Sequence, residues 1–427
     1  MLVAALVSLA ALARVVGLHE RTGDMVIFET WYQHLAAAGG WRGLGDNIGN
    51  YNAPFLYILA VTIYLPGPLI VKIKAVWLIF DVLLAFFTYK IVAWRWPGRR
   101  VATVAALVML MLPTVVINAS FYGQMDAMWA SFALGGLYFL LRDRPWWGVS
   151  LCTVALAIKP QGIFIFPLVL LLVLAGRIPW RSLLAAPAVF VGLDLPAIAL
   201  GRHPLELLTI YSLGRQGSHV PMLSQHAPSV YAFIPTAGNR VESVRMLGYI
   251  FAATLVLGIC YVLVVRGVAL TRERIVTAAT LFAILLPFTL PGMHERYFFL
   301  ADVLSVVLVF FRPRLWFVPM LVEAASLMSY ETYLFGHSTL MLPMVVPATL
   351  MLAALITVGY FLLRDAALPA AGDTTPPATS VPVEAPATIA APVTMTAPVT
   401  IAAKHAPNGK KPVTVAHGEA VATAAAP

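Results

Sequence analysis

The stretch Met246–Val265, MLGYIFAATLVLGICYVLVV, carries no charged side chain over the length of a bilayer-crossing helix, about 20 residues. Similar apolar runs recur along most of the 427 residues. Hydrophobic residues make up 60% of the chain and charged residues only 11%, and the mean hydropathy is +0.86. This composition excludes a soluble enzyme and predicts one all-α, polytopic bundle of transmembrane helices.

The apolar runs predict about 12 membrane spans within a domain of residues 1–363. They are Met1–Leu18, Leu69–Val92, Val101–Ile117, Ala127–Leu141, Trp146–Ile158, Gly162–Ala175, Leu183–Leu200, Met246–Val265, Ile275–Pro291, Tyr297–Phe311, Leu315–Tyr330 and Thr339–Leu363. The first of these could instead be a signal peptide, because ALA at Ala11–Ala13 resembles a cleavage site.

The segments between the spans differ in composition. Pro54–Leu65 is too short for a span, so we expect interfacial or re-entrant helices in a first outer loop, 19–68. The long outer loop 201–245 is rich in Pro, Gly, Ser and aromatic residues and suits a lid over a substrate. The Ala/Pro/Thr/Val-rich tail, 364–427, cannot bury enough apolar area to fold, so we expect disorder.

Basic residues set the expected orientation. They concentrate in alternate loops, which places both termini in the cytoplasm if the protein resides in a bacterial cytoplasmic membrane. The net charge of +9 therefore encodes topology, and no nucleic-acid partner is expected. Cys152 and Cys260 lie in separate apolar runs, which indicates neither a disulfide framework nor a zinc cluster.

Polar side chains gather in blocks on the predicted outer face. The first, TGDMVIFETWYQHL, places Asp24 at the start of an interfacial helix, either as a helix N-cap or as a catalytic base. The second, NASFYGQMDAM, presents Gln124 and Asp126, and Asp126 could also cap the next helix. Charged residues beside membrane helices are costly, so each carries a functional hypothesis.

Two further blocks supply cations. AIKPQG places Lys159 and Gln161 in a short recessed turn, where Lys159 needs an anion, either a lipid-linked phosphate or a helix carboxylate. LPGMHERYFFLADV places His294, Glu295 and Arg296 at the end of a helix; Arg296 suits a phosphate, and a structural ion pair is the alternative. We expect Asp24, Asp126, Lys159 and Arg296 to line one cavity. Within the spans, Asp81, Asp194 and Glu323 should face the bundle interior.

With these blocks, the chain resembles the GT-C superfamily of polytopic glycosyltransferases, in its bacterial branch similar to the second mannosyltransferase of GPI-anchor assembly. The motifs GDMVIFETW, NYNAPFLYIL, SFYGQMD, AIKPQG and above all MHERYFF carry the resemblance, which covers residues 1–363. It implies transfer of mannose from a polyprenyl-phosphate donor to a glycan, glycolipid or protein acceptor outside the cytoplasm. Asp24 would be the base, Lys159 and Arg296 would neighbour the phosphate, and Asp126 would contact a substrate or metal.

One carboxylate base with direct displacement implies inversion at the anomeric carbon. The resemblance requires no cofactor, and a divalent metal stays an alternative that no residue pattern indicates. A transporter or lipid-carrier flippase could also concentrate charges along a polar path, although it would place them near the membrane midplane. A structural membrane protein would explain the helices but not the clustering of polar blocks.

Overall fold

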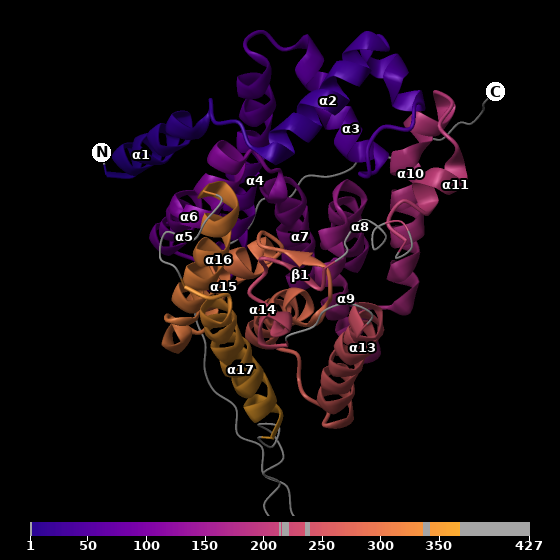
Figure 1. Cartoon of the computed structure of the whole chain (residues 1–427). Coiled ribbons are helices and arrows are strands. Elements are labelled where there is room, and N and C mark those ends of the chain that lie inside the picture. The colour runs from indigo at the N-terminus through magenta and orange to yellow at the C-terminus, as the bar shows by residue number, and fades with distance from the viewer. Residues whose placement is uncertain (1, 213–214, 216–221, 235–239, 336–341, 368–427) are drawn as a thin grey trace, which may run out of the picture. The chain divides into compact units, whose positions relative to one another are not determined.

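The computed structural model describes residues 2–212, 215, 222–234, 240–335 and 342–367. The predicted disordered tail lies almost wholly outside these residues, as do parts of the loop 201–245. The all-α prediction is confirmed: helices dominate the described chain, and the strands in it are two residues long, β1 (Ser224–Gln225) and β2 (Met293–His294). Figure 1 shows the order of the elements along the chain.

Most predicted apolar runs contain one helix each. The longer helices are α1 (Leu2–Gly17), α4 (Leu69–Arg95), α5 (Arg99–Met111), α7 (Asp126–Leu141), α8 (Pro145–Ile158), α9 (Phe166–Leu174), α10 (Ala185–Ala199), α13 (Val241–Val265), α14 (Arg272–Thr289), α15 (Phe299–Phe311), α16 (Val318–Phe335) and α17 (Val345–Ala367). Shorter helices connect them: α2 (Gly23–Ala37), η1 (Gly40–Gly45), α3 (Ala53–Val61), η2 (Thr62–Tyr64), α6 (Pro113–Val116), η3 (Ile117–Tyr122), η4 (Pro160–Ile165), η5 (Trp180–Leu184), α11 (Pro204–Leu208), η6 (Val230–Phe233) and η8 (Pro313–Leu315).

Three helical segments of the described chain are long and apolar enough to cross a membrane: Trp180–Ala199, Val241–Val265 and Val345–Arg364. A fourth would be the pair Arg99–Met111 and Pro113–Tyr122, which is bent by 52°. The predicted span Val101–Ile117 contains this bend, because Pro113 lacks the N–H that would continue the ladder of hydrogen bonds. Most of the other apolar helices are shorter than a span, so the count of about 12 stays a prediction.

The central helices and the outer helices of the described chain differ in how much of their surface is buried. Helices α7, α14 and α15 are buried along most of their length and form the centre of the core. In contrast, α13 exposes large apolar side chains such as Leu247 (63% exposed) and Ile250 (63%). Exposed apolar surface on this scale is unfavourable in water, whereas hydrocarbon solvates it. The outer helices thus have the surface expected of membrane spans.

One pair of opposite charges is buried between two helices of this bundle. Arg14 of α1 donates to Asp81 of α4 at 2.8 Å, and both side chains are almost fully buried. Asp81 and Asp194 are buried as expected, while Glu323 is partly buried and accepts from the backbone N–H and hydroxyl of Thr114. Glu323 thereby caps the helix that begins after the break at Pro113. Cys152 and Cys260 are both buried and free.

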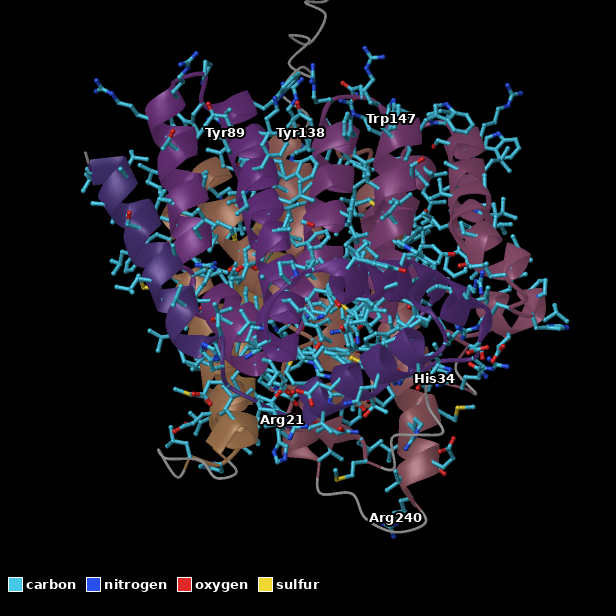
Figure 2. All side chains as sticks on the ribbon, turned by 90° about the horizontal axis from the view of Figure 1, so that it is seen from above. Arg21, His34, Tyr89, Tyr138, Trp147 and Arg240 are labelled. Carbon is cyan, nitrogen blue, oxygen red and sulfur yellow. The ribbon has the colours of Figure 1, made fainter. Side chains whose placement is uncertain are left out.

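The first loop lies at one end of the bundle. Helix α3 rises only about 14 Å at 1.5 Å per residue, too little to cross a bilayer. It begins at Asn52, whose side chain accepts from the N–H of Ala53 at 2.8 Å. Figure 2 shows Arg21 and His34 of this loop at the end of the bundle opposite Tyr138 and Trp147.

Candidate functional site

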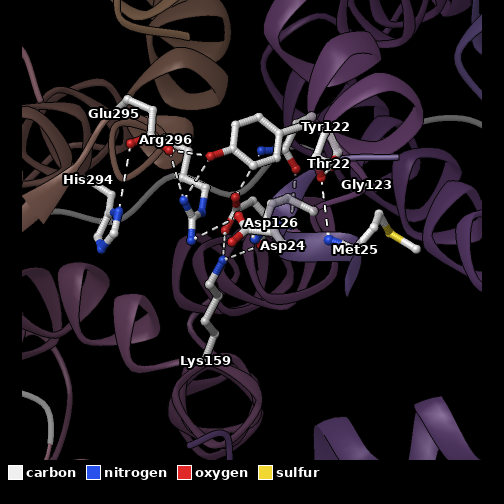
Figure 3. A network of polar contacts seen from close by, with 12 residues as sticks. Thr22, Asp24, Met25, Tyr122, Gly123, Asp126, Lys159, His294, Glu295 and Arg296 are labelled. Carbon is white, nitrogen blue, oxygen red and sulfur yellow. Dashed lines mark hydrogen bonds and ion pairs between the residues drawn. The ribbon is translucent and has the colours of Figure 1, made fainter. Parts of the chain in front are cut away.

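Polar residues from all four blocks meet in one place, as Figure 3 shows. We call this set the polar network, and its members are Asp24, Tyr122, Gln124, Asp126, Lys159, Glu295 and Arg296. They come from α2, η3, the segment between η3 and α7, α7 itself, the end of α8 and the turn between β2 and α15. Residues up to 272 positions apart in the chain, Asp24 and Arg296, lie within 3.3 Å of each other.

Asp24 is not the N-cap of α2. Thr22 holds that position: its hydroxyl accepts from the N–H of Met25 at 3.4 Å and donates to the carbonyl of Tyr122 at 2.6 Å. The cap alternative for Asp24 is therefore wrong. Instead, Asp24 Oδ2 accepts from Gln124 Nε2 at 2.5 Å and lies 3.3 Å from Arg296 Nη2. Its side chain is 15% exposed, more than the other carboxylates of the network.

A wide helical turn sets the position of Gln124. Residues Ile117–Tyr122 form a π-helix, a form that is rare and frequent at functional sites. The turn ends at Gly123, whose φ of +79° favours glycine. A Cβ at this position would lie 2.4 Å from Met25 Sδ, so glycine also permits the close approach of α2. The carbonyl of Gly123 accepts from Trp77 Nε1 at 3.1 Å.

Lys159 pairs with a carboxylate of the protein. Its Nζ donates to Asp126 Oδ1 at 2.5 Å and to Gln124 Oε1 at 3.1 Å, and the lysine side chain is 0% exposed. Asp126 also accepts from Asn118 Nδ2 at 2.9 Å and from Trp129 Nε1 at 2.8 Å. The structural pair considered from the sequence is thus what the structure contains, because a buried cation needs a nearby anion.

Arg296 contacts two carboxylates of the network, Glu295 and Asp24. Its Nη1 lies 2.8 Å from Glu295 Oε1 and donates to the hydroxyl of Tyr122 at 3.0 Å, while that hydroxyl donates to Glu295. Burial disfavours the charge of Glu295, but Arg296 and hydrogen bonds from His294 and Tyr122 outweigh it and hold the pKa of this carboxyl at about 2. Glu295 is therefore ionised at neutral pH.

Sequence reasoning missed Tyr122 as a member of the site. Its ring stacks on that of Tyr333, with centroids 4.5 Å apart and planes at 6°. Tyr122 was visible only as one letter of SFYGQMD, where an aromatic residue before glycine carries no sign of a hydrogen-bonding role. Its contacts with Glu295 and Arg296 span more than 170 positions, so local pattern could not reveal them.

The long loop 201–245 is joined to the fourth block by a short strand pair. Ser224 and Gln225 of β1 pair in parallel with Met293 and His294 of β2. The N–H of Glu295 donates to the carbonyl of Gln225 at 3.1 Å. The described part of the predicted lid therefore contacts the site through its backbone.

A cavity of about 1010 Å³ adjoins the network. Its walls are mainly apolar and come from α8, η4, α10, α13 and the strand pair; polar side chains on them include Asn50, Gln161, Gln225, His294 and Tyr297. Gln161 is 4% exposed, and its Oε1 has no hydrogen-bond partner among the described residues. Asp24, Asp126, Lys159 and Arg296 lie together, but they are not among the residues that line this cavity; their opposite charges pair with one another.

Metal ligands do not gather at the site. In the described parts of the chain, no group of three or more His, Cys, Asp or Glu side chains is placed to hold a metal ion. Asp24, Asp126 and Glu295 each face a cation of the protein instead.

No protein-family model matches this chain, and the curated proteins contain no match to it either.

Proposed function

We propose that this chain is a multi-pass membrane glycosyltransferase of the GT-C type, which transfers a sugar, mannose by resemblance, from a polyprenyl-phosphate donor to an acceptor hydroxyl. One observation carries the proposal: a partly exposed carboxylate, Asp24, lies against Arg296, and the neighbours of Arg296 in the chain, His294 and Tyr297, line a large and mainly apolar cavity. A lipid-linked sugar phosphate needs these three features together, namely a base, a charge partner for the leaving phosphate and an apolar place for its chain.

Asp24 is the base in this proposal. Asp126 and Glu295 are each 1% exposed and have several partners, whereas Asp24 is accessible. The acceptor oxygen forms a bond to the anomeric carbon as the bond from that carbon to the phosphate oxygen breaks. The acceptor proton passes to Asp24, and the bonding electron pair leaves with the phosphate. Attack opposite to the leaving group inverts the anomeric configuration.

Arg296 and His294 are the groups that we assign to the leaving phosphate. Arg296 Nε has no hydrogen-bond partner among the described residues, and His294 is 23% exposed on the cavity wall. An N–H of arginine forms strong, charge-assisted hydrogen bonds with phosphate oxygens. Gln161 Oε1, which is also without a partner in the described chain, is placed to accept from a sugar hydroxyl.

The apolar walls of the cavity suit the polyprenyl chain, and the orientation follows from the loop charges. In this proposal about 12 spans cross a bacterial cytoplasmic membrane, the termini lie inside, and the site faces outward. Asp46, in the same outer loop as Asp24, is 53% exposed and pairs with His34 outside the network. It offers a matched control for the carboxylate chemistry.

The experiment measures transfer of labelled mannose from polyprenyl-phosphate mannose by the purified protein. Asp24→Asn keeps the shape and the acceptor for Gln124 but cannot take a proton, so we expect transfer to be lost while donor binding and folding persist. Asp46→Asn should retain transfer. Normal transfer by Asp24→Asn would remove the assignment of the base. Lipid-carrier movement without sugar transfer by the unaltered protein would favour the flippase alternative.

A further inference from the structure

Three side chains form a continuous hydrogen-bonded line that ends at Asp24. Lys159 Nζ donates to Gln124 Oε1 at 3.1 Å, and Gln124 Nε2 donates to Asp24 Oδ2 at 2.5 Å. Lys159 and Gln124 are 0% and 1% exposed, so the line runs through the interior towards the partly exposed carboxylate.

The direction of these hydrogen bonds is fixed by chemistry. An ammonium group can only donate, so the oxygen of the Gln124 amide must face Lys159. The amide nitrogen must then face Asp24, where a carboxylate can only accept. A side chain without a donor in place of Lys159 would leave the amide oxygen of Gln124 without its partner, and Asp24 alone would then fix the orientation of the amide.

Lys159 has little capacity left for a substrate. Its ammonium is used by Asp126, by Gln124 and by the ring of Tyr51, whose centroid is 5.8 Å away. Neither Lys159 nor Arg296 lines the cavity, but Nε of Arg296 has no hydrogen-bond partner in the described chain. The contacts of Lys159 therefore make it a poorer candidate than Arg296 for binding the donor phosphate.

Both contacts of Asp24 with the network converge on a single oxygen. Gln124 Nε2 and Arg296 Nη2 each approach Oδ2, at 2.5 and 3.3 Å. Oδ1 has no side-chain hydrogen bond to any residue of the described chain. A carboxylate held by one oxygen presents the other in a defined direction.

We propose that Lys159 and Gln124 are positioning residues: Lys159 orients the amide of Gln124, and Gln124 holds Asp24 Oδ2 so that Oδ1 faces the acceptor hydroxyl. This inference rests on the proposed function, in which Asp24 takes the acceptor proton. It assigns to Lys159 a role in the turnover rate and none in donor affinity, in contrast to the role that the family resemblance implies.

Steady-state kinetics with varied polyprenyl donor test this assignment. Lys159→Met should lower kcat by about 10- to 100-fold, the value of one hydrogen bond to a charged group, and leave the donor KM unchanged. Lys159→Gln should recover much of this loss, because its amide nitrogen can still donate to Gln124 Oε1. The double variant of Lys159→Met and Gln124→Met should lose no more than Gln124→Met alone, since both break the same line.

Gln124→Glu tests the same contact from its other side. It keeps an acceptor for Lys159, which stays paired with Asp126, but it replaces the donating amide with a carboxylate that repels Asp24 when both are ionised. We expect a cooperative unfolding transition at a lower thermal midpoint, because of this repulsion, together with an unchanged donor KM and a lower kcat. A raised donor KM in both Lys159 variants, with no rescue by Lys159→Gln, would overturn the proposal in favour of a phosphate contact. So would a normal kcat in Gln124→Glu.

These outcomes are separate from those of the proposed function. If the unaltered protein transfers no sugar from any polyprenyl-phosphate donor, the proposed function fails. If it transfers sugar and Asp24→Asn abolishes transfer, while Gln124→Glu keeps full activity, only the positioning role fails.

Discussion

Gly123→Ala tests how tightly α2 is packed on the turn that leads into the site. The positive φ of +79° disfavours an alanine by about 1–2 kcal/mol. The new Cβ would also lie 2.4 Å from Met25 Sδ and 2.5 Å from Met25 Cγ, and relief of such overpacking costs about 1–3 kcal/mol. We therefore expect the free energy of unfolding to fall by about 2–5 kcal/mol in total.

Gly176→Ala is the matched control. Its φ of +65° imposes a similar backbone penalty, but no heavy atom lies within 4 Å of the added Cβ. Thermal or denaturant unfolding of the detergent-solubilised variants should therefore show a smaller loss for Gly176→Ala, by about 1–3 kcal/mol. Met25→Ala should relieve the contact, so the double variant with Gly123→Ala should be more stable than the two single losses predict. Equal losses at Gly123 and Gly176 would refute the packing argument.

Further expectations concern the rest of the chain. Tyr122→Phe removes a hydroxyl bonded to two charged side chains, and transfer assays should show an activity loss of about tenfold or more. The low pKa of Glu295 contributes stability above about pH 4.5 that is lost as pH falls towards about 2, so the stability difference from Glu295→Gln should shrink over that interval in acid unfolding. Arg14→Met should lower the thermal midpoint more than the double variant with Asp81→Leu, because the single change leaves a buried carboxylate alone. Deleting residues 366–427 should leave insertion into membranes and transfer activity nearly unchanged, as a truncated protein assayed beside the full chain would show.

The positions of most helices could be predicted from the sequence because apolar composition is a local property. Met246–Val265 marked the observed α13, and the helix begins five residues earlier, at Val241, in a polar stretch where Arg245 pairs with Glu242. The break at Pro113 was less visible, since Val101–Ile117 is apolar on both sides of it. Composition reports what can be buried in a bilayer, whereas bends depend on single backbone groups.

The candidate site was also only partly predictable from the sequence. The membership of Asp24, Lys159 and Arg296 could be predicted because charged residues beside membrane helices are few and costly. Their partners could not be predicted, since the pair of Lys159 with Asp126 depends on how α7 and α8 pack. The separation between the buried ion pairs and the cavity has the same origin. Which charged side chains pair, and where a cavity lies, both depend on how helices distant in the sequence pack together.

The polar network contains more carboxylates than cations. Asp24, Asp126 and Glu295 supply three carboxylates, while Lys159 and Arg296 supply two cations, which leaves one negative charge in excess. Under the proposed reaction, the acceptor proton on Asp24 would bring the sum to zero, and a neutral cluster is the less costly state in a buried site. The next turnover then requires release of that proton to the outer solution. The partly exposed edge of Asp24 is the route open to it.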